Sequence, residues 1–385
     1  MMFSAVVFSL VGYAELRIPD VITTYEEREL SSSGVFRFKA SEETENCELD
    51  VSLFEIIPLR KTKVHVGNRR YVCLGGEVFG LKIYSSGVLV VSTEDIITEN
   101  GAENPGKKAG IKSGDIIKEI NGTEINSNRE ISQICKNSNG KELIFTIERN
   151  SEKLTLKLNT VKEESSGNYK AGLWVRDSTA GIGTMTFFDR ETGVFASLGH
   201  AVCDGDTGIV LPLSEGMAVG AKILGCTKGT KTEAGELSGA FTANTIGKLY
   251  SNNICGVYGM LNKTDVSDEL IPVATAMEVR TGKAQILCSV DENGKKYYDV
   301  EITKILDSRS DEKNMTVKIT DEELLKITGG IVQGMSGTPL IQNGMLAGAI
   351  THVFVGNPTE GYAIFAENML NVADDIGATY ERKIS

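Results

Sequence analysis

The sequence predicts a mostly β protein of two or three domains, and three observations support this prediction. A chain of 385 residues exceeds one ordinary domain. Its 41 glycines, 7 prolines and aromatic content of 6% suit many short strands joined by glycine turns. Beyond residue 165, short apolar runs bounded by turn residues follow one another almost to the end, as strands do.

Bulk charge and cysteine spacing exclude several classes of function. The net charge is −12 and no long basic run occurs, so nucleic acid is not expected as a partner. The seven cysteines include no C-x-x-C pair, which argues against a zinc knuckle or a redox motif. The spacing of His200 and Cys203 would suit a metal, but no further ligands accompany them, so neither a metal site nor a cofactor is predicted.

The first part of the chain divides into two segments. Residues 1–14 carry no charge and lack a basic flank, so residues 1–20 are interpreted as the remnant of an export signal or membrane anchor. The alternative is a buried first strand. Residues 21–71 are polar with short apolar runs, which predicts a strand-rich lead-in.

A module is expected over residues 72–160. It contains a strand at 87–91, the tight-turn dipeptide Asn121-Gly122, a helix at 127–136 and two strands within 142–158. This pattern resembles a PDZ domain, in which an extended peptide adds as an edge strand. The resemblance implies a peptide-binding loop formed by Gly75, Gly76, Glu77, Val78, Phe79 and Gly80. Alternatively, the module only packs against its neighbour and binds nothing.

The remaining residues, 161–385, predict strands at 183–188 and 194–198, a hairpin at Asn293-Gly294, and one short helix at 320–327. Within them, Gly334-Met335-Ser336-Gly337-Thr338-Pro339 precedes an alternating strand over 340–350. A serine between two glycines in a tight turn projects its Oγ and its N–H to the same side, as a nucleophile with an oxyanion hole requires. The alternative is a hairpin corner with a solvated hydroxyl.

His200 is the predicted general base for Ser336. It ends a hydrophobic run, and its position 336 − 200 = 136 residues before the serine gives the chymotrypsin-like order. An α/β-hydrolase would place its serine between a strand and a helix, with the histidine last. We therefore predict a chymotrypsin-like double β-barrel protease domain, with the N–H groups of Gly334 and Ser336 as the oxyanion hole.

These features together resemble the stage IV sporulation protein B peptidases, which are chymotrypsin-like serine proteases preceded by a PDZ domain. The resemblance is carried by residues 75–80, 87–91, 198–200, 328–339 and 351–355. It implies a serine endopeptidase of endospore-forming bacteria, exported from the forespore into the space between two membranes. There it would cleave itself and a membrane-embedded regulator, which leads to processing of a pro-sigma factor.

The resemblance also places a third catalytic residue at Asp321, which lies 336 − 321 = 15 residues before the nucleophile. The residues alone leave a second interpretation open, because Thr320-x-x-Glu323 is a helix capping box. His65 and His352 are interpreted as packing or surface groups, and His352 could line the substrate cleft. Two rival functions remain: a catalytically silent PDZ scaffold that binds peptides, and a cysteine hydrolase that uses Cys203 or Cys255.

Overall fold

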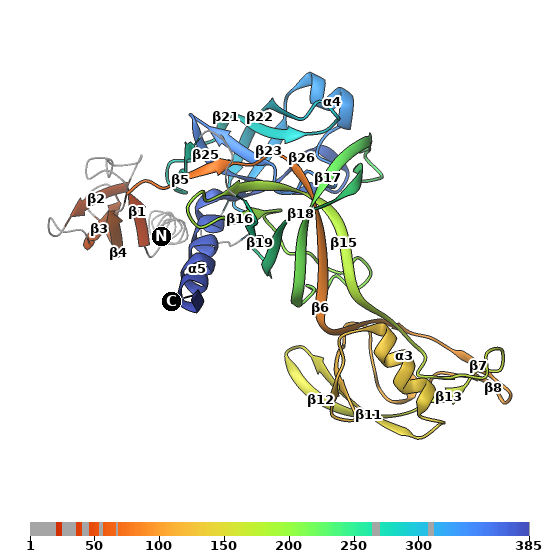
Figure 1. Ribbon diagram of the computed structural model, residues 1–385. Helices are drawn as coiled ribbons and strands as arrows, with labels where there is room; N and C mark the ends of the chain where they lie inside the picture. The colour runs from red at the N-terminus through yellow and green to blue at the C-terminus, as the bar shows by residue number, and fades with distance from the viewer. Residues whose placement is uncertain are drawn as a thin grey trace, which may run out of the picture.

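The computed structural model describes residues 21–24, 36–40, 46–53, 57–66, 68–263, 270–306 and 312–384. The expected export remnant at 1–20 lies outside these residues. The described chain is mostly β, as predicted, and its elements fall into a small N-terminal sheet, a protease body and a PDZ module (Figure 1). Among the described residues, no helix combines the length and apolar character needed to cross a bilayer.

The N-terminal sheet has four strands in the order β1-β4-β3-β2. Their bounds are β1 Val21–Thr24, β2 Phe36–Ala40, β3 Asn46–Leu53 and β4 Ile57–Val66.

The first barrel of the protease body is a closed ring of strands. β6, β17, β18, β19, β16 and β15 pair in that order, and β15 pairs back onto β6. Inside this barrel, the aromatic rings of Phe79 and Phe195 meet edge to face, with their centroids 5.8 Å apart. The bounds are β5 Tyr71–Leu74, β6 Val78–Thr93, β15 Leu173–Phe188, β16 Val194–Ser197, β17 Leu213–Thr227, β18 Glu236–Asn253, β19 Gly256–Leu261 and β20 Leu270–Pro272.

The second barrel closes in the order β21-β22-β23-β26-β25-β24, which confirms the predicted double barrel. Asn293-Gly294 falls in the turn that joins β21 to β22, as expected, and Gly294 has the positive φ of +88° that such a turn requires. The bounds are β21 Gly282–Ser289, β22 Lys295–Ile305, β23 Met315–Ile319, α4 Glu322–Thr328, β24 Pro339–Gln342, β25 Met345–Phe354, β26 Asn357–Phe365 and α5 Ala366–Ile384.

The PDZ module packs α3 against a sheet that includes β9, β11 and β12. Ser127 and Glu130 form a capping box at the start of α3, and Ile131 is buried on its inner face. The carboxylate of Asp115 is fully buried and bonded by the Arg149 guanidinium at 2.6 and 2.7 Å. The bounds are β7 Ile96–Thr98, β8 Gly101–Glu103, α2 Pro105–Lys108, β9 Ile116–Ile120, β10 Thr123–Glu124, α3 Asn128–Asn137, β11 Glu142–Arg149, β12 Glu152–Asn159, β13 Val161–Lys162 and β14 Tyr169–Lys170.

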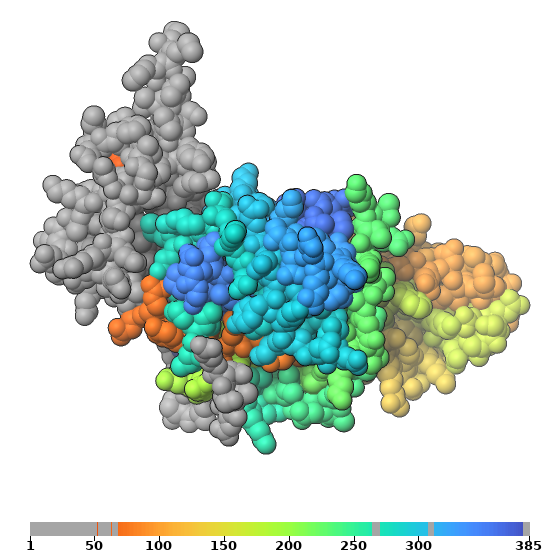
Figure 2. Space-filling model, turned by 90° about the horizontal axis from the view of Figure 1, so that it is seen from above, coloured from red at the N-terminus to blue at the C-terminus, as the bar shows by residue number. Residues whose placement is uncertain are grey.

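The PDZ module is inserted into the first barrel rather than placed before it. The first half of β6 pairs with β15 and β17 in the barrel, whereas its second half pairs with β9 in the module. β15 returns from the module beside β6, and both strands run without a break from one domain into the other (Figure 1). The module projects from the side of the protease body (Figure 2). The expected boundary at residue 72 therefore differs from the structure, in which β5 and half of β6 belong to the protease.

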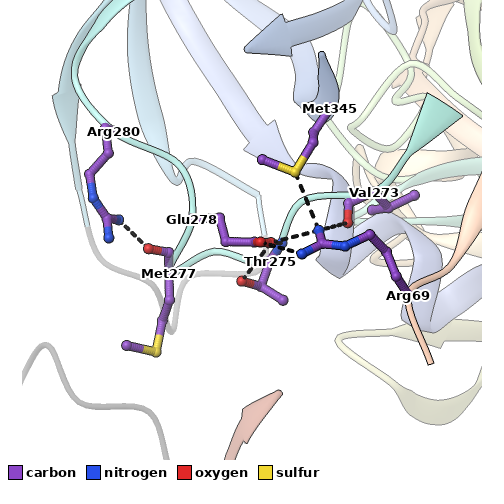
Figure 3. A network of polar contacts seen from close by, with 7 residues as sticks. All are labelled: Arg69, Val273, Thr275, Met277, Glu278, Arg280 and Met345. Carbon is purple, nitrogen blue, oxygen red and sulfur yellow. Dashed lines mark hydrogen bonds and ion pairs between the residues drawn. The ribbon is translucent and has the colours of Figure 1, made fainter. Parts of the chain in front are cut away.

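An ion pair fixes the start of the first barrel to the second (Figure 3). The guanidinium of Arg69 donates to both carboxylate oxygens of Glu278, at 2.6 and 3.2 Å. Glu278 in turn accepts from the N–H and hydroxyl of Thr275. Both side chains of the ion pair are about one-fifth exposed, so water screens the pair only partly. Arg69, two residues before β5, is thereby held against the loop that enters the second barrel.

Candidate active site

Ser336 lies in the turn that precedes β24. Gly334 and Gly337 on either side have φ of +95° and +92°, a region that side chains with a Cβ rarely adopt. A Cβ on Gly337 would also lie 2.0 Å from the carbonyl oxygen of Thr184. The two glycines are therefore required by the backbone path. The half-buried Ser336 hydroxyl donates to the Thr351 carbonyl oxygen at 2.7 Å.

Backbone N–H groups around Ser336 alternate between bonded and free. The amides of Gln333, Met335 and Gly337 donate to backbone carbonyls at 2.8–3.1 Å. In the described part of the chain, the intervening amides of Gly334 and Ser336 donate to no protein acceptor. Two unpaired donors on either side of one residue form the arrangement that stabilises the oxyanion of a tetrahedral intermediate.

Residues of β15 hold this turn in place through hydrogen bonds. Thr184 holds it twice, because its Oγ1 donates to the Gly334 carbonyl at 2.8 Å and its N–H donates to the Ser336 carbonyl at 3.0 Å. Thr186 Oγ1 donates to the Gly337 carbonyl at 2.7 Å. Both threonines are almost fully buried, so these bonds are shielded from water.

His200 follows β16 through two residues of positive φ, Leu198 at +62° and Gly199 at +67°. Its Nδ1 lies 2.7 Å from the carbonyl oxygen of Ala201. A carbonyl oxygen can only accept, so Nδ1 carries the proton and Nε2 keeps its lone pair. Burial lowers the pKa of His200 from its usual value, which keeps the ring neutral at neutral pH. The ring is thus prepared to accept a proton at Nε2.

The loops that carry His200 and Ser336 are in direct contact. A Cβ on Gly337 would lie 2.4 Å from the amide nitrogen of Leu198, and one on Gly199 would lie 2.8 Å from the Thr351 methyl. His200 and Ser336 both line one cavity of about 530 Å³ between the two barrels. No hydrogen bond among the described residues joins the two side chains, since the Ser336 hydroxyl bonds to Thr351. A hydrogen bond from the Ser336 hydroxyl to His200 would therefore replace the bond to Thr351.

Asp321 lies away from this cavity, at the N-terminus of α4. Its side chain accepts from the N–H of Leu324 at 3.0 Å and from the N–H of Asp299 at 3.3 Å. No hydrogen bond or ion pair between described residues connects it with His200. The geometry is that of a helix cap, with Asp321 itself, rather than Thr320, as the capping residue. The role of Asp321 as the orienting carboxylate stays a prediction.

The loop expected to bind peptides in the PDZ domain lies instead in the protease body. The amides of Gly75 and Gly76 donate to carbonyls of β15 at 3.0 and 2.8 Å. Val78, Phe79 and Gly80 pair with β15, and Phe79 is buried in the barrel core. Glu77 lies between these two groups, with an exposed side chain and a carbonyl that accepts from β15. These residues cannot accept a peptide strand, because the barrel already uses their backbone groups.

A comparison with protein-family models assigns two regions of the chain. Residues 167–370 match the SpoIVB peptidase S55 family, and residues 80–160 match a PDZ domain. The chain belongs to the SpoIVB peptidase S55 family. It therefore combines a serine peptidase domain of this family with a PDZ domain, as the sequence predicts.

Other relatives of this S55 peptidase match smaller parts of it. A Lactococcus lactis protein named as a zinc metalloprotease (LL2128) is 29% identical over 203 residues, which make up 49% of the chain and 46% of the relative. Zinc metalloprotease RasP of Shouchella clausii is 32% identical over 99 residues, 26% of the chain and 23% of the relative. The chain thus spans less than half the length of these two relatives. Within the described residues, no three His, Cys, Asp or Glu side chains cluster as metal ligands would.

Solved structures resemble the S55 peptidase only loosely. The HtrA-type protease AlgW with a decapeptide has 13% identity and a TM-score of 0.33, and the match covers 56% of this chain and 55% of that one. The active form of the Rv3671c protease from M. tuberculosis has 11% identity and a TM-score of 0.28, with 50% and 72% covered.

Sequence analysis named one close neighbour of His200, which is His352, but not the charged residues Glu312 and Lys313. His352, expected to pack or to line the cleft, does line it, and its ring lies 4.6 Å from that of His200. Burial, His200 and Lys313 lower the pKa of His352 to about 4. The charge of Glu312 raises the pKa of His200, and the charge of Lys313 lowers it. No sequence signal marks Glu312 and Lys313, because they precede β23, whose position beside β26 and β25 depends on long-range strand pairing.

The thiols of the rival cysteine mechanism are poorly placed for it. Cys203 lines the cavity, and much of its surface is exposed. Partial desolvation of its thiol and the charge of Glu312 raise the pKa of that thiol, which disfavours the nucleophilic thiolate. Cys255 is buried in a hydrophobic core. His65 lies in β4, outside the protease body.

Proposed function

We propose that this S55 peptidase is an endopeptidase that acts through an acyl-enzyme on Ser336. The free N–H groups of Gly334 and Ser336 carry this proposal, since both residues line the cavity that His200 also lines. His200 Nε2 takes the Ser336 proton as Oγ attacks the scissile carbonyl carbon, and then delivers it to the leaving amine. Water hydrolyses the acyl-enzyme by the same route. The Ala201 carbonyl holds the tautomer throughout.

Labelling with a fluorophosphonate tests this mechanism. Wild-type protein should form one adduct, which peptide mapping places on Ser336, and Ser336→Ala should form none and cleave nothing. The variant should remain folded, because it loses a single bond to Thr351 worth about 1 kcal/mol. Unchanged cleavage by pure Ser336→Ala protein, together with loss of cleavage after alkylation of Cys203, would favour the thiol mechanism instead.

We further propose that the enzyme cleaves itself and a membrane-embedded regulator during sporulation, after export from the forespore into the intermembrane space. Membership of the SpoIVB peptidase family supports this role. In a sporulating host, replacement by Ser336→Ala should block processing of the pro-sigma factor while the regulator stays intact. Processing that continues normally with the inactive variant would contradict the proposed role.

Peptide binding by the PDZ module is proposed for a different strand from the one expected. In its first part, from Leu173 to Arg176, β15 pairs with β6 along one edge, and no described strand pairs with its other edge. Leu173 and Val175 share the core of α3, and the amide of Asn128 at the start of α3 bonds to Asp177 at 2.9 Å. An extended peptide can therefore add to the other edge, beside α3. Val175→Pro, which lacks an N–H, should abolish peptide binding measured by fluorescence anisotropy.

A further inference from the structure

A short hairpin over residues 202–211 follows the catalytic base directly. Its two arms pair at Cys203 and Val210. Between His200 and the hairpin lies Ala201, whose carbonyl accepts the bond from the proton-bearing Nδ1 of the base. A shift of the hairpin would therefore move the group that fixes the tautomer of the base.

The turn of this hairpin is built on the fully buried carboxylate of Asp204. Its Oδ1 accepts from the N–H groups of Asp206 and Thr207 at 3.1 and 2.8 Å, and from the Thr207 hydroxyl at 2.9 Å. Its Oδ2 accepts from the guanidinium of Arg176, which also donates to Asp206 at 2.7 Å. Burial alone would raise the pKa of Asp204, but the bonds from Thr207 and the charge of Arg176 outweigh it, so the carboxylate is ionised at neutral pH.

The partner of this carboxylate comes from the side of the PDZ module. Arg176 lies in β15 opposite Leu89, in the half of β6 that also pairs with β9 of the module. The module reaches the hairpin at a second point, because a Cβ on Gly114 would lie 2.6 Å from Cδ1 of Ile209. The hairpin beside the catalytic base is thus held from the module as well as from the barrel.

We propose that Arg176 is a positioning residue for catalysis, because its bond to Asp204 holds the hairpin in the place that keeps Nε2 of His200 free to accept a proton. This inference rests on the proposed acyl-enzyme function. Arg176 is not among the residues that line the cavity, so it acts through the hairpin. Without the guanidinium, a buried carboxylate would lack its positive partner, and the turn would carry Asp204 out towards water. The Ala201 carbonyl would move with the hairpin and lose its hold on the ring.

A double-mutant cycle tests this pair through the rate at which a fluorophosphonate labels Ser336. Arg176→Met should slow labelling by about tenfold to a hundredfold, because a small displacement of a catalytic group costs rate on that scale. Asp204→Asn keeps an oxygen for the donors of the turn but loses the charge that Arg176 pairs with, so it should slow labelling similarly. The double variant carries no unpaired buried charge and should lose no more than either single variant. Labelling of the folded double variant at the wild-type rate would overturn the proposal, as would losses that multiply.

Two further variants separate positioning from general stability. Arg176→Lys keeps a positive charge within reach of Asp204 and should recover part of the rate. Arg149→Met is the matched control, because it removes a guanidinium from Asp115, an equally buried carboxylate in the core of the module. It should label at the wild-type rate, and an equal loss there would overturn the proposal, since the effect would then follow the stability of the module. Absence of labelling in the wild type would instead overturn the proposed acyl-enzyme function.

Nitrogen-15 NMR of the histidine rings tests the route through Ala201. The chain has three histidines, so single substitutions can assign the ring signals. In the wild type, His200 should show the tautomer that is protonated at Nδ1, and in the double variant it should show exchange between both tautomers. An unchanged tautomer in a slowly labelling variant would overturn the assigned route.

Discussion

Thr184→Val tests whether β15 positions the oxyanion hole. The substitution keeps the side-chain shape and removes only the hydroxyl that donates to the Gly334 carbonyl at 2.8 Å. The backbone bond from Thr184 to the Ser336 carbonyl remains. Thr184 is 1% exposed, and the bond that it donates to Gly334 is partly buried. Loss of this bond should lower the free energy of unfolding by about 1 kcal/mol.

The same change should slow acylation. Complete loss of one oxyanion donor costs roughly a hundredfold to a thousandfold in rate. Thr184→Val leaves both donors in place but frees the peptide plane between them, so we expect a smaller loss, on the order of tenfold, in the rate constant for a peptidyl phosphonate. Thr146→Val is the control, since it removes a hydroxyl from the PDZ module, where Thr146 bonds to Glu119. A lowered melting temperature with an unchanged acylation rate would refute the bracing role.

Two further predictions concern the base and the helix cap. Because kcat/KM requires neutral His200, whose pKa is lowered by burial, activity should fall only as pH drops below about 6.5. Lys313 lowers this pKa and Glu312 raises it. Lys313→Met should therefore move the fall in activity to higher pH, and Glu312→Gln should move it to lower pH. Shifts in one common direction would refute the assigned charges. Asp321→Ala should cost about 1 kcal/mol of stability, whereas Asp321→Asn should keep the melting temperature, because asparagine caps equally well. A loss of turnover in folded Asp321→Asn protein would assign Asp321 the orienting role.

Sequence reasoning predicted those features of the site that depend on local backbone geometry. The glycines around Ser336 force a turn whatever surrounds them, and the order of His200 and Ser336 follows from the fold class. The PDZ peptide loop could not be located in this way, because Val78 and Phe79 alternate equally well in a barrel strand and at a PDZ edge. Only the pairing with β15 and β17 decides between these positions.

The hydrogen-bond partners of His200 and of the turn at Ser336 could not be predicted from sequence either. The bond from His200 to Ala201 depends on two consecutive residues of positive φ, and Leu198 gives no sign of adopting one. Likewise, Thr184 lies 150 residues from Gly334, and only the closure of the barrels brings them together. Local patterns thus pointed to Ser336 and His200, which line one cleft, whereas the residues that support them depend on long-range strand pairing.

Because the PDZ module is inserted within the first barrel, it can be removed as an internal deletion but not by truncation of the chain. A cut before residue 161 would delete β5 and β6 and open the barrel ring. A short turn from Tyr84 to Ser178, which are paired neighbours, would instead leave the ring continuous. The same two strands supply Ile83 and Ile182 to the wall of the cleft, so part of that wall stands on strands that continue into the module.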